Sequence, residues 1–213
     1  VHYGHSPMTL NVDVPTVYFD SRAEIDIKEV VKKALPYVES LSKIGLVTTV
    51  QHVHQLNEIK NLLEVAGKTV FVGDADIVKY AGQVLGCDFS NAQAISKKVE
   101  AYIFVGGGRF HAIGVALATD KPTIIVDPYE QVAYPIQDQV RRIIMQRWAN
   151  IVEAKQAKAF GILISLKSGQ MRLTEAISIK EKLEKIGLKS ESFSEIINTL
   201  PWKDINSMNK MSA

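Results

Sequence analysis

The sequence has little cysteine: one residue, Cys87, in a chain of 213. A single thiol excludes an internal disulfide framework, and this fits a protein of the reducing cytoplasm. One thiolate also cannot hold a metal cluster without further ligands. The chain has no run of about 18 apolar residues, so we expect no membrane-spanning helix.

The first residues lack the marks of a targeting segment. Residues 1–5 have neither the basic nor the apolar region of a secretory signal peptide. The sequence also begins without methionine and opens directly on a motif. We therefore expect a fragment of a longer protein, preceded by further sequence.

The chain has no strong excess of charge of either sign. Its 25 basic and 23 acidic residues leave a net charge of +2. That balance gives no electrostatic reason to expect direct nucleic-acid binding. Apolar residues make up 46% and charged residues 23% of the chain, which is typical of a globular protein with a packed core.

Short apolar runs alternate with amphipathic segments along the chain. Continuously apolar runs predict parallel strands buried on both faces, so the expected fold class is α/β, with serial repeated Rossmann-like units whose parallel sheets are flanked by helices. The predicted strands are 16–20, 46–50, 69–72, 101–105, 123–127 and 161–165. The predicted helices are 25–41, 56–66, a short one to 95 capped by Ser90 or Asn91, 112–118, 140–158 and 172–186.

The sequence repeats this pattern. Residues 4–20 resemble residues 107–127, and residues 45–67 resemble residues 161–187. The segments 45–67 and 161–187 both end on a glycine that follows the predicted helix. A duplicated α/β unit explains both similarities, and a parent of three units is the simplest inference. We assign 1–44 to the tail of a first α/β domain plus a linker helix, 45–135 to a middle α/β domain carrying Cys87, and 136–213 to a linker helix and the start of a third α/β domain.

Polar loops follow the predicted strands at their carboxyl ends, where parallel sheets place ligands. Four such loops are 2–6, 51–55, 106–111 and 167–170. The glycines Gly106, Gly107 and Gly108 would let backbone approach a ligand closely, and the next helix would offer N–H groups to a carboxylate or phosphate. The pattern is neither a Walker loop nor a dinucleotide fingerprint. A tight strand-to-helix turn is the alternative interpretation.

All the histidines lie in those loops: His2, His5, His52, His54 and His111. A zinc or iron site is one interpretation. Hydrogen bonding within each loop is the other. On a helix, the spacing of two residues would not place His52 and His54 on one face.

Two further residues carry open alternatives. Cys87 lies in a glycine-flanked loop, which favours a reactive thiolate over an inert core thiol. Asp127 ends a predicted strand, where it could bind a ribose hydroxyl or cap a turn.

Seven linked motifs together resemble one known family, the archaeal diphthamide-synthesis enzymes, or 2-(3-amino-3-carboxypropyl)histidine synthases. The similarity covers nearly the whole chain and weakens after about residue 190. The motifs occupy residues 3–6, 51–56, 82–87, 106–111, 127–129, 147–149 and 168–172.

The resemblance implies a specific chemistry. Members are homodimers of three related α/β domains, each giving one cysteine to a 4Fe-4S cluster. By a radical mechanism at that cluster, they transfer a 3-amino-3-carboxypropyl group from S-adenosylmethionine to a histidine of translation elongation factor 2, the first step of diphthamide biosynthesis. The expected protein is therefore a cytoplasmic transferase that uses a 4Fe-4S cluster and S-adenosylmethionine, with elongation factor 2 as its protein substrate.

The resemblance also assigns residues. Cys87 matches the metal-ligating cysteine of the middle domain, and the other two cysteines are expected outside this sequence, so the fragment alone should be inactive. Gly106, Gly107, Gly108, His111 and Gln170 are the expected S-adenosylmethionine site, and no catalytic residue is assigned. The rival interpretations are a non-catalytic supporting subunit of such an enzyme and a nucleotide-binding Rossmann-like module.

Two geometric predictions follow. Cys87 should lie outside helices and strands and face the space where the two other cysteines would converge. The loops at 106–111 and 167–170 should approach each other across a domain boundary, because ligand sites favour such boundaries.

Overall fold

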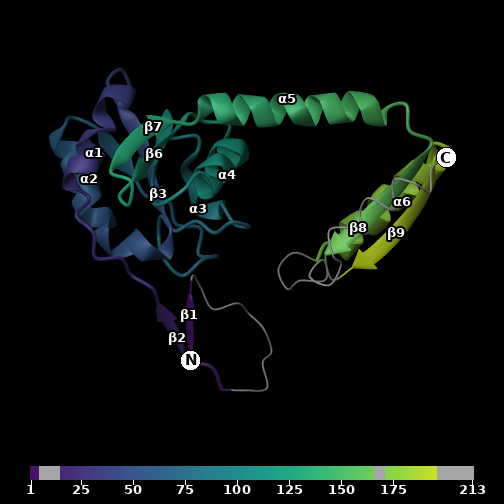
Figure 1. Ribbon diagram of the computed structural model, residues 1–213, viewed down its shortest axis with the longest axis horizontal. Coiled ribbons are helices and arrows are strands. Elements are labelled where there is room, and N and C mark those ends of the chain that lie inside the picture. The colour runs from purple at the N-terminus through teal and green to yellow at the C-terminus, as the bar shows by residue number, and fades with distance from the viewer. Residues whose placement is uncertain (5–14, 166–170, 196–213) are drawn as a thin grey trace. The chain divides into compact units, whose positions relative to one another are not determined.

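The computed structural model describes residues 1–4, 15–165 and 171–195 (Figure 1). The chain divides into two compact units, and the division falls between Trp148 and Ala149 in the long helix α5 (Gln137–Ala154). The predicted domain boundaries near 44 and 135 stay predictions. No helix among the described residues is long and apolar enough to cross a membrane.

The first unit is built on a five-stranded sheet with the strand order β4-β3-β5-β6-β7. Four strands are parallel, as predicted: β3 (Lys43–Thr48), β4 (Thr69–Phe71), β5 (Ala101–Val105) and β6 (Thr123–Asp127). The fifth, β7 (Val132–Pro135), was not predicted and pairs antiparallel with β6 at the edge. The parallel-dominated sheet flanked by helices confirms the α/β fold class.

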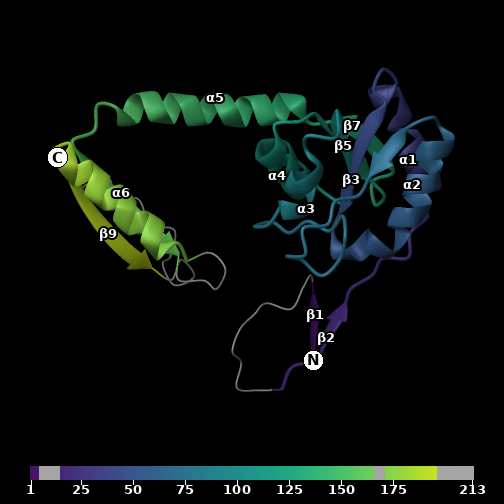
Figure 2. The same cartoon turned by 180° about the vertical axis from the view of Figure 1, so that it is seen from behind.

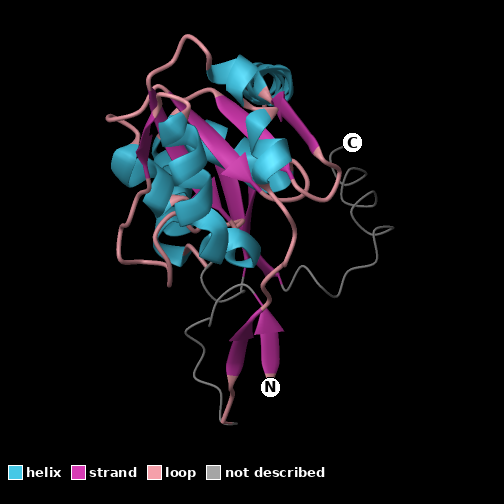
Figure 3. Ribbon diagram, turned by 90° about the vertical axis from the view of Figure 1, so that its left-hand side faces the viewer, coloured by secondary structure: helices cyan, strands magenta, loops and turns pink. Residues whose placement is uncertain are grey.

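Helices cover both faces of this sheet (Figures 1 and 3). One face carries α1 (Lys28–Lys32), the 3-10 helix η1 (Leu35–Val38) and α2 (Leu56–Val65), and the other carries α3 (Ser90–Ile95) and α4 (Phe110–Thr119). Successive strand residues point to opposite faces, so Ile103 lies in the first core cluster and Phe104 in the second. Both side chains are fully buried.

The predicted helix 25–41 is wrong as a single element. It consists of α1 and η1, because Pro36 has no N–H to donate and restricts the residue before it. The predicted apolar face is nevertheless correct, since its residues pack in the first core cluster. They are Ile27, Val30, Val31, Ala34 and Val38.

A separate pair of parallel strands lies near the N-terminus, β1 (His2–Gly4) and β2 (Tyr18–Asp20). β2 falls within the predicted strand 16–20. By the sequence repeat, this pair corresponds to β5 and β6, which are also parallel neighbours.

The second unit contains β8 (Ala159–Ser165), α6 (Leu173–Lys185) and β9 (Lys189–Glu195), with β8 and β9 parallel (Figure 2). The corresponding β3-α2-β4 segment has the same arrangement. Both helices end in the same backbone motif, in which Gly67 (φ +82°) or Gly187 (φ +80°) adopts the left-handed conformation. In each, the next residue donates to the carbonyl five residues earlier, Lys68 to Leu63 and Leu188 to Leu183.

Candidate functional site

The carboxyl ends of β3 and β5 form the switch point of the parallel sheet. The two strands are hydrogen-bonded neighbours. However, α2, which follows β3, packs in the first core cluster, and α4, which follows β5, packs in the second. The connections leave on opposite faces, and open α/β sheets bind ligands at such a switch point.

The predicted glycine loop follows β5 at this edge. Gly106 (φ +154°) and Gly108 (φ +74°) hold backbone conformations that other residues rarely adopt. A Cβ atom on Gly107 would lie 3.0 Å from Cδ2 of Tyr129, so this glycine lets the tyrosine ring pack against the loop. Gly107 and Gly108 are exposed, and no side chain caps α4. The loop therefore presents bare backbone at the start of a helix.

Asp127, at the end of β6, holds the glycine loop through its side-chain carboxylate. Its Oδ2 accepts a hydrogen bond from the N–H of Gly108 at 3.1 Å. Its Oδ1 accepts from the N–H groups of Tyr129 at 2.9 Å and Glu130 at 3.2 Å. The residue is only 4% exposed. These contacts are those of a turn cap, which is the second of the two roles predicted for Asp127.

His52 is a buried polar side chain near this switch point. It lies in the 3-10 helix η2 (Val50–Gln55), directly after β3, and is fully buried. Gln55 donates from Nε2 to the carbonyl oxygen of Ile25 at 2.7 Å, so its Oε1 faces His52 Nδ1, 2.9 Å away, as an acceptor. The ring proton is thereby assigned to Nδ1. Nε2 is left as a buried acceptor with no hydrogen-bond partner among the described residues.

The environment of His52 favours its neutral form. Burial lowers the pKa of His52 below its ordinary value of 6.5, and the hydrogen bond with Gln55 opposes this shift only in part. The His52 ring meets the Tyr129 ring edge-on, with centroids 5.6 Å apart. Sequence reasoning missed this role. The spacing of His52 and Gln55 was the available signal, because residues three apart in a 3-10 helix lie above one another.

The other two histidines whose side chains the structure describes, His54 and His111, have separate contacts. His54 Nε2 lies 3.6 Å from Glu24 Oε1. His111, in the first turn of α4, stacks on the buried Phe104 ring with centroids 5.9 Å apart. His5 and the side chain of His2 lie outside the described residues. Within the described residues, no group of three or more His, Cys, Asp or Glu side chains is arranged to hold a metal ion.

Cys87 is exposed and lies in a turn, which confirms its predicted place outside helices and strands. An antiparallel bridge between Leu85 and Asp88 closes this turn. The Asp88 carboxylate accepts a hydrogen bond from the N–H of Ser90 at 2.9 Å. The predicted caps Ser90 and Asn91 are therefore wrong: Ser90 is already helical, and Asp88 supplies the acceptor.

Asn91 instead holds the chain that leads to Cys87. Its fully buried side chain accepts a hydrogen bond from the N–H of Ala75 at 2.8 Å. It donates to the carbonyl oxygens of Tyr80 at 2.9 Å and Gln83 at 3.1 Å. The same chain is tied to β2, because the Tyr80 hydroxyl and the Lys79 ammonium group both contact the Asp20 carboxylate. These contacts lower the pKa of Asp20, and the hydrogen bond from Tyr80 has the largest effect.

The Cys87 turn and the glycine-loop segment meet. A Cβ atom on Gly86 would lie 2.6 Å from Cε1 of Phe110, the first residue of α4. The predicted residues Gly106, Gly107, Gly108 and His111 thus belong to the segment that contacts this turn. Gln170 lies outside the described residues, so the predicted approach of 106–111 to 167–170 stays a prediction.

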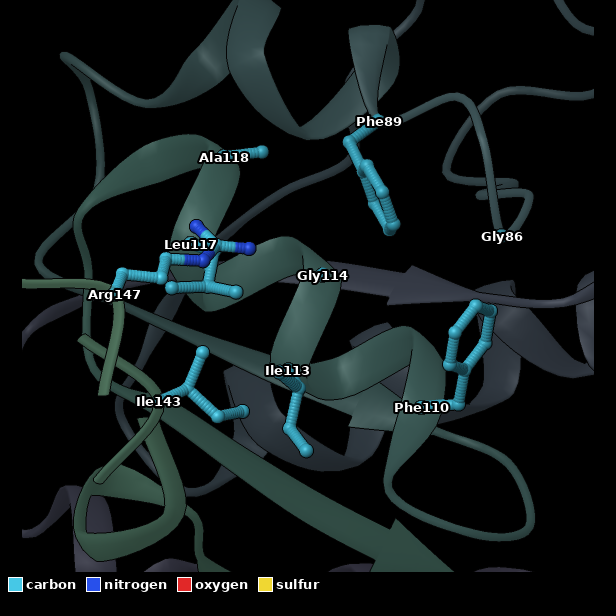
Figure 4. A pocket seen from close by; sticks show the side chains of 9 residues that line it. All are labelled: Gly86, Phe89, Phe110, Ile113, Gly114, Leu117, Ala118, Ile143 and Arg147. Atoms are coloured by element: carbon cyan, nitrogen blue, oxygen red, sulfur yellow. The ribbon is translucent and has the colours of Figure 1, made fainter. Parts of the chain in front are cut away.

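An open groove of about 530 Å³ adjoins the Cys87 turn. Its walls come from the Cys87 turn, the start of α3, α4 and α5 (Figure 4). The lining residues are Gly86, Phe89, Phe110, Ile113, Gly114, Leu117, Ala118, Ile143 and Arg147.

Comparison with known proteins identifies relatives along almost the whole chain. Residues 1–196 match the family described as diphthamide synthesis protein. The chain is 40% identical over 189 residues to the 2-(3-amino-3-carboxypropyl)histidine synthase of Pyrococcus horikoshii, an alignment that covers 88% of this chain and 54% of the relative. It is 31% identical over 175 residues to subunit 1 of the same synthase in Schizosaccharomyces pombe, covering 76% of this chain and 39% of the relative.

A solved structure has the same fold. The crystal structure of Dph2 from Pyrococcus horikoshii with a 4Fe-4S cluster matches with a TM-score of 0.82 and 37% identity, covering 97% of this chain and 60% of that chain. The chain thus spans about half the length of the curated relatives that it matches.

Proposed function

The chain belongs to the diphthamide synthesis protein family, and from this membership we propose that the whole protein is a 2-(3-amino-3-carboxypropyl)histidine synthase. In the proposed reaction, a 3-amino-3-carboxypropyl group passes from S-adenosylmethionine to a histidine of translation elongation factor 2. This is the first step of diphthamide biosynthesis. We propose that the protein works in the cytoplasm as a homodimer.

The observation that carries the proposal is the position of Cys87. In a chain 40% identical to a named synthase, the single cysteine is exposed in a turn and contributes no apolar packing to either core cluster. Iron–sulfur clusters are held by cysteine thiolates, and a thiol in this position fits a ligand better than a structural residue. One thiolate supplies one ligand, so the proposed cluster needs cysteines from outside this chain.

The residues present fit a 4Fe-4S cluster as the source of one of its ligands. Cys87 would ligate it, and Asp88 and Asn91 would hold the turn in place through the hydrogen bonds described above. When bound, the cluster would supply the electron for the radical cleavage of the sulfonium C–S bond of S-adenosylmethionine. The loops at the carboxyl edge of the sheet would hold and orient the S-adenosylmethionine molecule.

The chain's own groups suit parts of that substrate. The exposed backbone at Gly107, before the uncapped start of α4, suits the carboxylate of S-adenosylmethionine, because helix N-termini attract anions. The N–H of Gly108 is already bound by Asp127. His52 keeps a buried acceptor atom at Nε2, which suits a hydrogen-bond donor of the ligand if the Tyr129 ring moves aside. We keep His111 and Gln170 as proposed contacts.

The test uses the full-length protein, purified anaerobically and reconstituted with iron and sulfide. Reduced protein with S-adenosylmethionine should modify a histidine of elongation factor 2, detected by peptide mass spectrometry, and should release methylthioadenosine. Protein that binds the cluster but modifies elongation factor 2 only when a partner is added would favour the supporting-subunit alternative. Nucleotide binding without any iron would favour the Rossmann-like module and contradict the proposal.

A further inference from the structure

The groove beside the Cys87 turn is almost entirely apolar. Phe89, Ile113, Leu117 and Ile143 line its floor and walls, and Phe110 stands at one end with 68% of its surface exposed. A largely exposed aromatic ring at the start of a helix gains little from folding, since burial is what stabilises an apolar side chain. Its position is therefore unexplained by the stability of this unit.

Two glycines leave room for the aromatic walls. A Cβ atom on Gly114 would lie 2.0 Å from Cζ of Phe89, and one on Gly86 would lie 2.6 Å from Cε1 of Phe110. Each ring thus occupies space that a larger residue would fill. The half-buried Phe89 wall is packed in place before any partner binds, and a preorganised wall reduces the entropy that binding must overcome.

The groove has a direction. Figure 4 shows Gly86 and Phe110 at one end and Arg147 at the other. Arg147 is the one charged residue of the lining. In the part of the chain that the structure describes, no carboxylate pairs with it. Gly86 lines the opposite end of the groove and directly precedes the exposed Cys87, so this end lies beside the Cys87 turn.

We propose that this groove docks a segment of the protein substrate that carries apolar side chains and one carboxylate. The apolar side chains would contact Phe89, Phe110 and Ile113, and the carboxylate would pair with Arg147. The far end of such a segment would lie beside the Cys87 turn. The proposal rests on the proposed function, because that function requires a protein substrate to reach this turn.

The position of the groove decides for this occupant. A second copy of the chain would satisfy the apolar walls equally well, but the groove ends beside the Cys87 turn, which a protein substrate has to reach in the proposed function. The exposed Arg147 guanidinium suits a planar, bidentate partner such as a carboxylate of that substrate. The aromatic and arginine residues at the groove are also the types that dominate binding energy in protein interfaces.

The test measures binding directly, with the full-length, cluster-loaded protein and elongation factor 2 as the probe. Phe110→Ala and Arg147→Ala should each weaken binding about tenfold, and Arg147→Glu should weaken it further, because loss of an interface anchor costs affinity on this scale. In turnover, the KM for elongation factor 2 should rise while the KM for S-adenosylmethionine and the iron content stay unchanged. Arg142→Ala, which removes an exposed arginine of the same helix outside the groove lining, is the matched control and should bind normally.

The outcomes separate the docking proposal from the proposed function. Unchanged binding in all three groove variants overturns the docking proposal, even in an active enzyme. A shift of the variants from dimer to monomer in sedimentation, with elongation factor 2 binding intact, assigns the groove to a second copy and also overturns it. Weakened binding in a protein that never modifies elongation factor 2 supports docking and contradicts the proposed function instead.

Discussion

At the scale of the residue, His52 shows how burial sets a side chain's charge. The imidazole is fully buried, and burial lowers its pKa below 6.5. The unfolded chain exposes the same ring to water, where its pKa returns to the ordinary value. Between the two pKa values, unfolded His52 binds a proton that folded His52 does not, so the folded state loses stability as the pH falls.

The first prediction concerns this pH dependence. The free energy of unfolding contributed by His52 should be fully present above pH 6.5 and should decrease as the pH falls below it, by at most about 1.4 kcal/mol per pH unit. Melting of the full-length protein at a series of pH values measures this. The variant His52→Gln removes the titrating ring and should show a shallower decrease.

Other titrating groups are common to both proteins, so the difference between the two slopes isolates His52. Parallel slopes for wild type and His52→Gln would mean that His52 is solvated or already charged in the folded protein.

The second prediction concerns Asn91. Asn91→Ala would leave the Ala75 N–H and the Tyr80 and Gln83 carbonyl groups without the partners they now have. Because unsatisfied buried polar groups are costly, the variant should lose about 2–4 kcal/mol of stability. Gln93→Ala, an exposed amide of the same helix, is the control and should melt within a few degrees of wild type. Equal melting of the two variants would show that Asn91 does not hold this segment.

At the scale of the element, the start of α3, the Cys87 turn and α4 fit together through their glycines. Gly114 lies under the Phe89 ring, and its absent Cβ would fall 2.0 Å from that ring. Gly86 lies under Phe110, which is largely exposed and free to turn outward. The two positions should therefore respond differently to the same substitution.

The third prediction is this difference. Gly114→Ala should destabilise the protein by about 1–3 kcal/mol, because it overpacks a half-buried ring. Gly86→Ala should cost less than about 0.5 kcal/mol, as surface substitutions usually do. Chemical denaturation of both variants checks this, and a Gly86→Ala protein at least as unstable as Gly114→Ala contradicts it.

Much of the fold followed from the sequence, because continuously apolar runs such as 101–105 and 123–127 allow few structures other than buried strands. The failures have local causes. Pro36 broke a helix whose apolar periodicity was correct. β7 is a four-residue edge strand with partly exposed side chains, so its apolar pattern is weak.

The candidate site was less predictable, because it depends on contacts between distant residues. Cys87 was placed correctly, since its flanking glycine already indicated a turn. The role of His52 was missed, because it depends on the Tyr129 ring and on Ile25, which orients Gln55, and both are far away in the sequence. Asp127 kept two interpretations until its contact with Gly108 was known.

At the scale of the whole molecule, the repeat connects both units to one ancestral pattern. α2 and α6 end in the same glycine motif, and each joins two parallel strands. A parent of three such units, each with one cysteine, stays a prediction. The chain itself has one cysteine and spans about half of its curated relatives.

The most direct test of the account is paired iron analysis and thermal melting of Cys87→Ala in the full-length protein. Cys87 is exposed, so the free energy of unfolding of the variant should stay within about 0.5 kcal/mol of that of wild type. The variant should nevertheless lose most of its bound iron and the spectrum of the cluster. Lys97→Ala, an exposed residue after α3, should keep both. Normal iron content in Cys87→Ala, together with a collapsed melting temperature, would show that Cys87 is a structural residue and not a ligand.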